Sequence, residues 1–241
     1  MIKIKIENIS KKYDKAEKYA LENINLNIEN NGIVALIGSN GSGKSTFLNT
    51  LGGFINREGN VIYEGLEKRR NMYSHIGFCP QSQVMDWYTN VFDNVVLGPL
   101  MAGKKLREAK ALSLKALEIV SLTDKKDSSV DSLSGGQQQR VQVARAIAHE
   151  PNIYFLDEPT TGLDAESSEK MLTYLKEKAD EGAIVVISSH DLHLLEKYAS
   201  KLIFLKEGKL KYEGTVEEFI NKYSGDEESP NLRDLYLSLI A

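Results

Sequence analysis

The stretch that decides the fold is Ile33-Val-Ala-Leu-Ile-Gly-Ser-Asn-Gly-Ser-Gly-Lys-Ser45. Its first five residues form a continuous apolar run, which is typical of a parallel strand covered by helices on both faces. The remainder, residues 38–45, fits the pattern G-x-x-x-x-G-K-[ST], and a helical stretch through Leu51 follows. A strand, a glycine-rich loop and a helix in this order predict a loop that binds phosphate groups.

Each residue type in this loop suits a phosphate ligand. Glycines let the backbone N–H groups point inward, and the helix N-terminus adds positive potential. Lys44 supplies a cation, and the Ser45 hydroxyl can bind Mg²⁺. An accidental glycine-rich turn is the alternative, but roughly 1% of chains this long would match by chance. The residues expected to bind a nucleotide here are Gly38, Ser39, Asn40, Gly41, Ser42, Gly43, Lys44, Ser45 and Thr46.

The surrounding sequence predicts two kinds of strand and a helical insertion. Apolar residues alternate with polar ones near residues 2–6 and 24–28, which indicates half-buried antiparallel strands. Residues 153–156 and 183–187 are continuous apolar runs, as expected for further parallel strands. Helical spacing appears between about residues 82 and 150, at Leu106, Ala109, Ala116 and Val120 and at Val141, Ala144 and Ala148. We expect an α/β domain over residues 1–223, then a linker and a C-terminal helix within residues 224–241.

Composition restricts the function without specifying it. The 241 residues carry a net charge of −4, and the longest basic run is Lys68, Arg69 and Arg70, so nucleic-acid binding is not expected. The single cysteine, Cys79, allows no intrachain disulfide, which suits a reducing cytoplasm. No secretory signal is recognisable, and no apolar run reaches the roughly 20 residues that span a bilayer, so a membrane role would require a separate partner chain.

Two adjacent acids, Asp157 and Glu158, end the apolar strand of residues 153–156. If the strand alternation continued, their side chains would point to opposite sides. Asp157 can then hold Mg²⁺ and Glu158 can act as general base toward the water that attacks a γ-phosphate. Alone, such a pair is more often the solvated start of a loop. The phosphate loop favours the catalytic interpretation.

A second glycine-containing motif, Leu133-Ser-Gly-Gly-Gln137, precedes the helix of Val141 and Ala144. Ser134 and Gln137 have the S-x-x-Q spacing of a helix capping box. Capping explains those two residues but leaves Gly135 and Gly136 unexplained. A glycine pair at a helix N-terminus would allow the phosphate of another molecule to approach the backbone.

The phosphate loop, residues 133–137 and the pair Asp157 and Glu158, in this order along the chain, resemble the nucleotide-binding domain of ATP-binding cassette (ABC) proteins, and the resemblance covers nearly the whole chain. The resemblance implies a P-loop (RecA-like), mostly parallel sheet core with an antiparallel β subdomain and an inserted α-helical subdomain. It also implies that Ser134, Gly135, Gly136 and Gln137 contact ATP held by a second subunit. Two cassettes, as a homodimer or a heterodimer, would then enclose two ATP molecules.

Four further positions match landmarks of the family. Tyr13 matches the aromatic residue that stacks on adenine, although Tyr19 is close enough to compete, and Gln81 matches the glutamine that contacts Mg²⁺ and couples to the transport partner. Asp164 matches a loop that crosses the dimer interface, with helix N-capping as the alternative. His190 matches the histidine that contacts the γ-phosphate. The resemblance thus assigns catalysis to Glu158, His190 and Lys44, and the metal to Ser45, Gln81 and Asp157.

The expected role is the ATPase subunit of a transporter, at the inner face of the cell membrane through a transmembrane permease. Residues 85–92 carry five apolar side chains, which either form a docking surface or pack in the core: Met85, Trp87, Tyr88, Val91 and Phe92. Residues 86–95 resemble importers and residues 232–237 resemble single-cassette exporters, and the balance leans weakly to export. A soluble ABC ATPase of the cofactor-assembly type remains the alternative. A P-loop kinase or GTPase would not explain residues 133–137.

Overall fold

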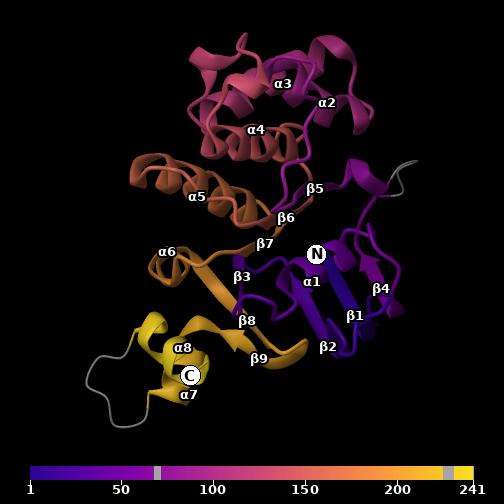
Figure 1. Cartoon of the computed structure of the whole chain (residues 1–241), viewed down its shortest axis with the longest axis vertical. Helices are drawn as coiled ribbons and strands as arrows, with labels where there is room; N and C mark the ends of the chain where they lie inside the picture. Colours follow the sequence, from indigo (N-terminus) through magenta and orange to yellow (C-terminus); the bar gives the residue numbers. More distant parts are fainter. Residues whose placement is uncertain (68–71, 225–230, 241) are drawn as a thin grey trace.

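The computed structural model describes residues 1–67, 72–224 and 231–240, and within them the central sheet has six strands (Figure 1). Their spatial order is β5 (Ile76–Cys79), β6 (Ile153–Asp157), β7 (Ile184–Ser188), β3 (Ile33–Ile37), β8 (Ala199–Lys206) and β9 (Lys209–Thr215). The first five strands run parallel, and β9 pairs antiparallel with β8. Both the sheet and its parallel direction agree with the predicted α/β core.

Both faces of the sheet are buried at β3, β6 and β7, which explains the uninterrupted apolar runs of these three strands. On β3, Val34 and Leu36 face one hydrophobic cluster, which they share with Phe47. Ile33 and Ala35 face a second cluster on the other side of the sheet. The side-chain alternation therefore persists along β3, but every position must be apolar because neither face meets water.

A smaller antiparallel sheet covers the first face, in the order β2 (Leu21–Glu29), β1 (Lys3–Lys11) and β4 (Glu58–Glu64). Ile4 pairs with Ile28 and Ile6 with Leu26, and all four side chains are buried. The predicted half-buried antiparallel strands are thus confirmed. Strand β4 was not predicted, because its sequence begins Glu-Gly-Asn and shows little apolar alternation.

The helices fall into three groups along the molecule (Figure 1). Helix α1 (Lys44–Leu51) follows the phosphate loop, and α5 (Ala165–Asp180) and α6 (Leu192–Tyr198) follow strands of the central sheet. Helices α2 (Val91–Met101), α3 (Leu106–Ile119) and α4 (Gly135–Ile147) gather at one end, whereas α7 (Val216–Tyr223) and α8 (Leu232–Ile240) lie at the other. Short 3-10 turns occupy Met72–Ser74, Thr123–Lys125 and Val130–Ser132.

Some sequence expectations need correction or lie outside the described residues. Leu106 was expected on a buried helical face, but it is 55% exposed at the start of α3. The basic run at residues 68–70 and most of the expected linker, residues 225–230, lie outside the described residues. None of the helices within the described ranges combines the length and apolar character needed to cross a bilayer.

Candidate functional site

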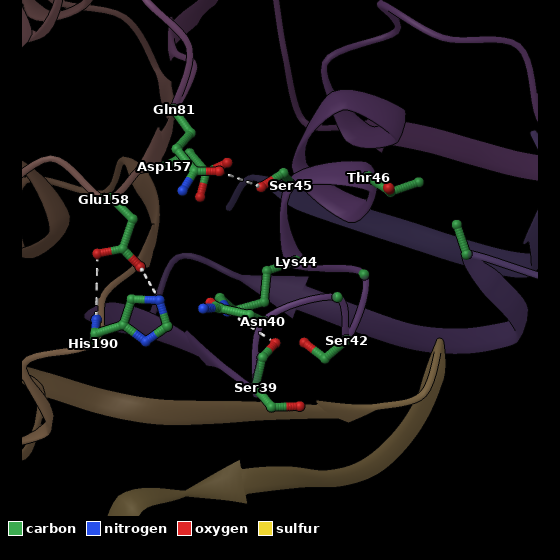
Figure 2. Close-up of a pocket in the computed structure, with 13 residues that line it drawn as sticks. Ser39, Asn40, Ser42, Lys44, Ser45, Thr46, Gln81, Asp157, Glu158 and His190 are labelled. Atoms are coloured by element: carbon green, nitrogen blue, oxygen red, sulfur yellow. Dashed lines mark hydrogen bonds and ion pairs between the residues drawn. The ribbon is translucent and has the colours of Figure 1, made fainter.

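A polar pocket of about 280 Å³ opens where the loop after β3 meets the carboxyl ends of β6 and β7 (Figure 2). In open parallel sheets this edge is where ligands bind. Most of the residues predicted from the sequence line it: Ser39, Asn40, Gly41, Ser42, Gly43, Lys44, Ser45, Thr46, Gln81, Asp157, Glu158 and His190. The structure therefore brings together side chains that lie up to 151 residues apart, from Ser39 to His190.

The loop before α1 depends on glycine at Gly43. Its φ is +105°, and a Cβ added there would lie 2.5 Å from the carbonyl oxygen of Ala20. Lys44 follows directly and is nearly buried, and its Nζ donates to the carbonyl oxygens of Gly38 at 2.7 Å and Ser39 at 3.4 Å. The ammonium group is thereby held at the loop, where a bound anion would meet it.

Burial and two nearby carboxylates act in opposite directions on the pKa of Lys44. Burial lowers the pKa of its ammonium group, while the nearby carboxylates of Glu158 and Asp157 act to raise it. A cation poorly compensated by solvent interacts strongly with an added negative charge, because the local dielectric constant is low. This position suits the recognition of polyphosphate.

Three oxygen-bearing side chains lie together on the other side of the pocket. The Ser45 hydroxyl donates to Gln81 Oε1 at 3.5 Å, and the buried Asp157 carboxylate accepts a hydrogen bond from the Ser188 hydroxyl. Among the described residues no group of three or more His, Cys, Asp or Glu side chains gathers as a metal site. A hydroxyl, an amide oxygen and one carboxylate nevertheless fit Mg²⁺, which takes few protein oxygens when phosphate supplies others.

Glu158 has an unusual backbone and a buried side chain. Its φ is +53°, which is rare for a residue other than glycine, and its N–H donates to Ser188 O at 3.2 Å and Ser188 Oγ at 3.0 Å. The strand alternation therefore ends at Asp157. The expectation that the two acids point to opposite sides is corrected, because both line the same pocket (Figure 2).

The Glu158 carboxylate faces His190. The His190 backbone N–H donates to Oε2 at 3.3 Å, and His190 Nε2 lies 3.4 Å from Oε1. Burial raises the pKa of this carboxyl group, against the lowering effects of His190 and Lys44, and the charge of Asp157 adds to the increase. A carboxylate with a raised pKa accepts a proton more readily, as a general base must.

Some predicted residues do not line this pocket. Tyr13 lies beside it and is partly exposed, with its hydroxyl 3.3 Å from Thr46 Oγ1. Asp164 is the N-cap of α5 and accepts from the Ser167 N–H at 2.7 Å, so the capping interpretation holds for it. That same hydrogen bond lowers the pKa of the Asp164 carboxyl group.

Residues 134–137 also lie outside the pocket. Ser134 and Gln137 form the predicted capping box at the start of α4, with both reciprocal hydrogen bonds present. Gly136 packs against the loop that carries Gly162, since a Cβ added at Gly136 would lie 2.7 Å from Gly162 O. Gly135 and Gly136 border a neighbouring concavity of about 420 Å³, together with Gln81, Glu158, Gly162 and His190.

Two residues contribute to the site without having been predicted from the sequence. Ala20 lines the pocket from the turn before β2, and Ser188 holds both Asp157 and the backbone of Glu158. Ser188 is the last residue of β7, as Asp157 is of β6, and that shared position after an apolar run was a usable signal. Ala20 gave no signal, since nothing in its local sequence sets it apart.

The chain matches the family model described as ABC transporter over residues 21–161. It is 34% identical over 225 residues to the glutamine transport ATP-binding protein GlnQ of Escherichia coli strain K12, covering 90% of this chain and 93% of that one. It is 36% identical over 211 residues to the manganese transport system ATP-binding protein MntB of Listeria monocytogenes, covering 84% and 86%.

Among solved structures, the chain resembles the dimeric post-hydrolysis state of the ATP-binding cassette MJ0796 bound to ADP and Pi. The TM-score is 0.79 at 31% identity, covering 88% of this chain and 98% of that chain. These relatives are named for the transport of glutamine and of manganese, and they give no support to the weak inclination toward export. They also give no support to a soluble assembly ATPase. By sequence, fold and the placement of its phosphate loop, this chain belongs to the ABC transporter family and is an ATP-binding subunit with ATPase activity.

Proposed function

We propose that this chain hydrolyses ATP to drive the import of a small nutrient through a separate transmembrane permease. The observation that carries the chemistry is the convergence of Lys44, Asp157, Glu158 and His190 on one pocket beside the glycine-rich loop. Such a set can bind polyphosphate, hold a divalent cation and accept a proton from water. Other P-loop enzymes share only part of it.

In this proposal residues 38–46 wrap the phosphates and Tyr13 stacks on adenine. Tyr13 lies close to the first turn of α1 through Thr46, which supports its placement at the nucleotide's outer end. Ser45, Gln81 and Asp157 would hold Mg²⁺, which would neutralise phosphate charge and orient the phosphates. Their oxygen atoms are of the type this ion prefers.

Glu158 would accept the proton of the attacking water. Its buried carboxylate, raised pKa and fixed backbone all favour this role, and among the described residues its Oε1 accepts no hydrogen bond. His190, which lies next to the Glu158 carboxylate, would stabilise negative charge on the γ-phosphate. Lys44 would stabilise the negative charge that spreads over the transferred group.

A second copy of the chain would complete each site. Residues 134–137 lie outside their own phosphate pocket, at a helix N-terminus whose backbone can meet an anion. We propose that they contact ATP bound by the partner copy, with Asp164 close to the same interface. The dimeric structure reported for MJ0796 supports an assembly of this kind.

The membrane partner would contact the exposed loop after Gln81. Trp87 is 43% exposed and Tyr88 is 100% exposed, whereas Val91 is buried and Met85 and Phe92 pack partly against the core. Of the five residues predicted for a docking surface, only Trp87 and Tyr88, both in the loop, are therefore available for docking.

We further propose that the chain works at the inner face of the membrane. Residues 1–223 would form the ATPase domain, with a helical insertion at about 82–150.

An uptake assay tests the transport proposal. Cells that carry Glu158→Gln in place of the native chain should accumulate ¹⁴C-labelled glutamine, or another substrate found by screening amino acids and Mn²⁺, at least about tenfold more slowly. The loss follows from the missing general base. Cells that carry Glu177→Gln, a change on the exposed face of α5, serve as the control.

Two results would count against import. One is faster net accumulation of a solute in the Glu158→Gln cells, which would indicate export. The other is that the chain, purified from detergent-solubilised membranes, carries no membrane-spanning protein with it. Either result would leave the ATPase chemistry in place while removing the proposed direction or the proposed partner.

A further inference from the structure

Two buried glutamines on α4 connect the loop after β5 to the strand end that carries the acidic pair. Gln139 and Gln142 are 6% and 1% exposed, one helical turn apart. Burying an amide side chain is unfavourable unless its donors and acceptor are paired. Each of these amides has specific partners, and the partners form a continuous path.

The outer end of the path is the backbone of Val84. Its N–H donates to Gln142 Oε1 at 2.7 Å, and its carbonyl oxygen accepts from Arg145 Nη2 at 2.5 Å. Gln142 and Arg145, three residues apart on one face of α4, thus bind the backbone N–H and the carbonyl oxygen of Val84. The Val84 side chain itself is exposed, as are those of Trp87 and Tyr88. The loop is fixed to α4 by its backbone while its apolar side chains face outward.

The inner end of the path reaches two strands of the central sheet. Gln142 Nε2 donates to Gln139 Oε1 at 3.0 Å. Gln139 Nε2 in turn donates to the carbonyl oxygen of Asp157 at 3.5 Å and to Cys79 Sγ at 3.6 Å. Cys79 ends β5 and Asp157 ends β6. The two amides therefore link the Val84 loop to the edge of the sheet where the pocket lies.

The carbonyl of Asp157 and the N–H of Glu158 belong to one peptide group. Gln139 holds its oxygen, and Ser188 accepts from its N–H through both its carbonyl and its hydroxyl. The orientation of this group sets the φ of Glu158, which is +53°. A residue with a Cβ adopts that region at a cost of about 1–2 kcal/mol, so it must be held there by its neighbours. Gln139 and Ser188 are those neighbours.

We propose that the Gln142–Gln139 pair, named here the amide relay, couples the position of the Val84 loop to the peptide that orients Glu158. Gln139 is then a positioning residue for the base, and it acts through the Asp157 carbonyl, although it also borders the concavity of Gly135 and Gly136. The inference rests on the proposed function, in which the loop faces the permease and Glu158 activates water. A permease that displaces Val84 would change the turnover of bound ATP through these two side chains.

Backbone amide exchange, followed by NMR on the full-length chain without nucleotide, tests the relay directly. Gln142→Met removes both ends of the Gln142 amide with little change in volume. It should speed exchange of the Val84 N–H and also of the Glu158 N–H, which Gln142 does not touch, each by about fivefold or more. Faster exchange at Val84 with unchanged exchange at Glu158 would overturn the proposal.

Two further variants separate the relay from a general loosening of the fold. Gln139→Met should speed exchange at Glu158 and change Val84 much less, because the Val84 bond to Gln142 Oε1 remains although Gln142 Nε2 loses its acceptor. Gln138→Met is the matched control, since this neighbouring buried amide bonds the carbonyls of Val130 and Leu133 instead. It should leave exchange at both positions unchanged, and a change at Glu158 in this control would also overturn the relay.

Kinetics give a second readout. In Gln139→Met, kcat should fall about five- to tenfold while KM for ATP stays within about twofold, because ATP still binds but the base is misplaced. An unchanged kcat would overturn the positioning role. If the wild-type chain hydrolysed no ATP, the proposed function would fail by itself, and the exchange experiment would still decide whether the relay exists.

Discussion

At the scale of single residues, Glu158 combines features that are each unfavourable for stability. Its backbone lies in the left-handed region, and its carboxylate is buried beside Asp157. Backbone strain of this kind, together with a displaced pKa, is typical of a residue retained for chemistry. We therefore expect that the protein would be more stable without this carboxylate.

The effect should depend on pH in a defined direction. Burial raises the pKa of Glu158 above its ordinary value of 4.5, so the folded chain binds its proton more tightly than the unfolded chain does. Stability is then lost as the pH rises from about 4.5 through the folded pKa. Glu158→Gln should have nearly the wild-type Tm near pH 4 and a Tm about 2–4 °C higher at pH 8.

Differential scanning calorimetry across this range checks the prediction. Glu177→Gln, on the exposed face of α5, provides the comparison for removing a carboxylate that is not buried. A Tm difference that stayed constant with pH would show that the attractions of Lys44 and His190 balance the burial of Glu158, and one that favoured the wild type at pH 8 would show that they outweigh it.

At the scale of elements, the start of α4 has some features that can be predicted from the local sequence and others that cannot. The capping box of Ser134 and Gln137 is a local pattern, and the structure confirms it. The packing of Gly136 on Gly162 and the hydrogen bonds of Gln139 depend on how distant segments meet. Gln137 was singled out by the capping pattern, but no local pattern distinguishes Gln139 from its neighbour Gln138.

The same limit applies to the strands and the docking loop. Continuous apolar runs identified β3, β6 and β7, because burial on both faces leaves a sequence signature. Apolar content could not separate exposed Trp87 and Tyr88 from buried Val91, since the first two lie in the loop before α2 whereas Val91 begins the helix and packs in the core. Nor could it place Tyr13 relative to the pocket, because Tyr19 lies only six residues away.

The two glycines of α4 give a prediction at this scale. A Cβ at Gly136 would lie 2.7 Å from Gly162 O, whereas a Cβ at Gly135 would meet nothing closer than Gln83 Nε2 at 3.7 Å. Gly136→Ala should therefore destabilise the chain by about 1–3 kcal/mol, and Gly135→Ala should be neutral or slightly stabilising through higher helix propensity.

Chemical denaturation of both variants, combined with an ATPase assay, tests this pair. The proposed contact with the partner's ATP requires both glycines, so both variants should lose most turnover although only one loses stability. Full activity in Gly135→Ala would contradict the proposed role of this helix start in the partner's site. Equal stability of the two variants would contradict the packing of Gly136 on Gly162.

At the scale of the whole molecule, one chain carries both the phosphate pocket and the glycine pair of α4, which border separate but neighbouring concavities. The pocket with Lys44 and Glu158 lies at the edge of the central sheet, and the glycine pair lies at the start of α4. In the proposed function each ATP lies between the phosphate pocket of one chain and the glycine pair of its partner, so ATP would bring two chains together. Hydrolysis would then release them, and the permease would follow that cycle.

The most direct test of this central claim is the molar mass of the Glu158→Gln chain, measured by light scattering after gel filtration in Mg²⁺ and ATP. This variant should bind ATP without hydrolysing it and should elute as a dimer, at twice the 26.9 kDa of one chain. With ADP, or with Gly136→Ala added, it should elute as a monomer. A chain that stayed monomeric while saturated with ATP would contradict the shared site.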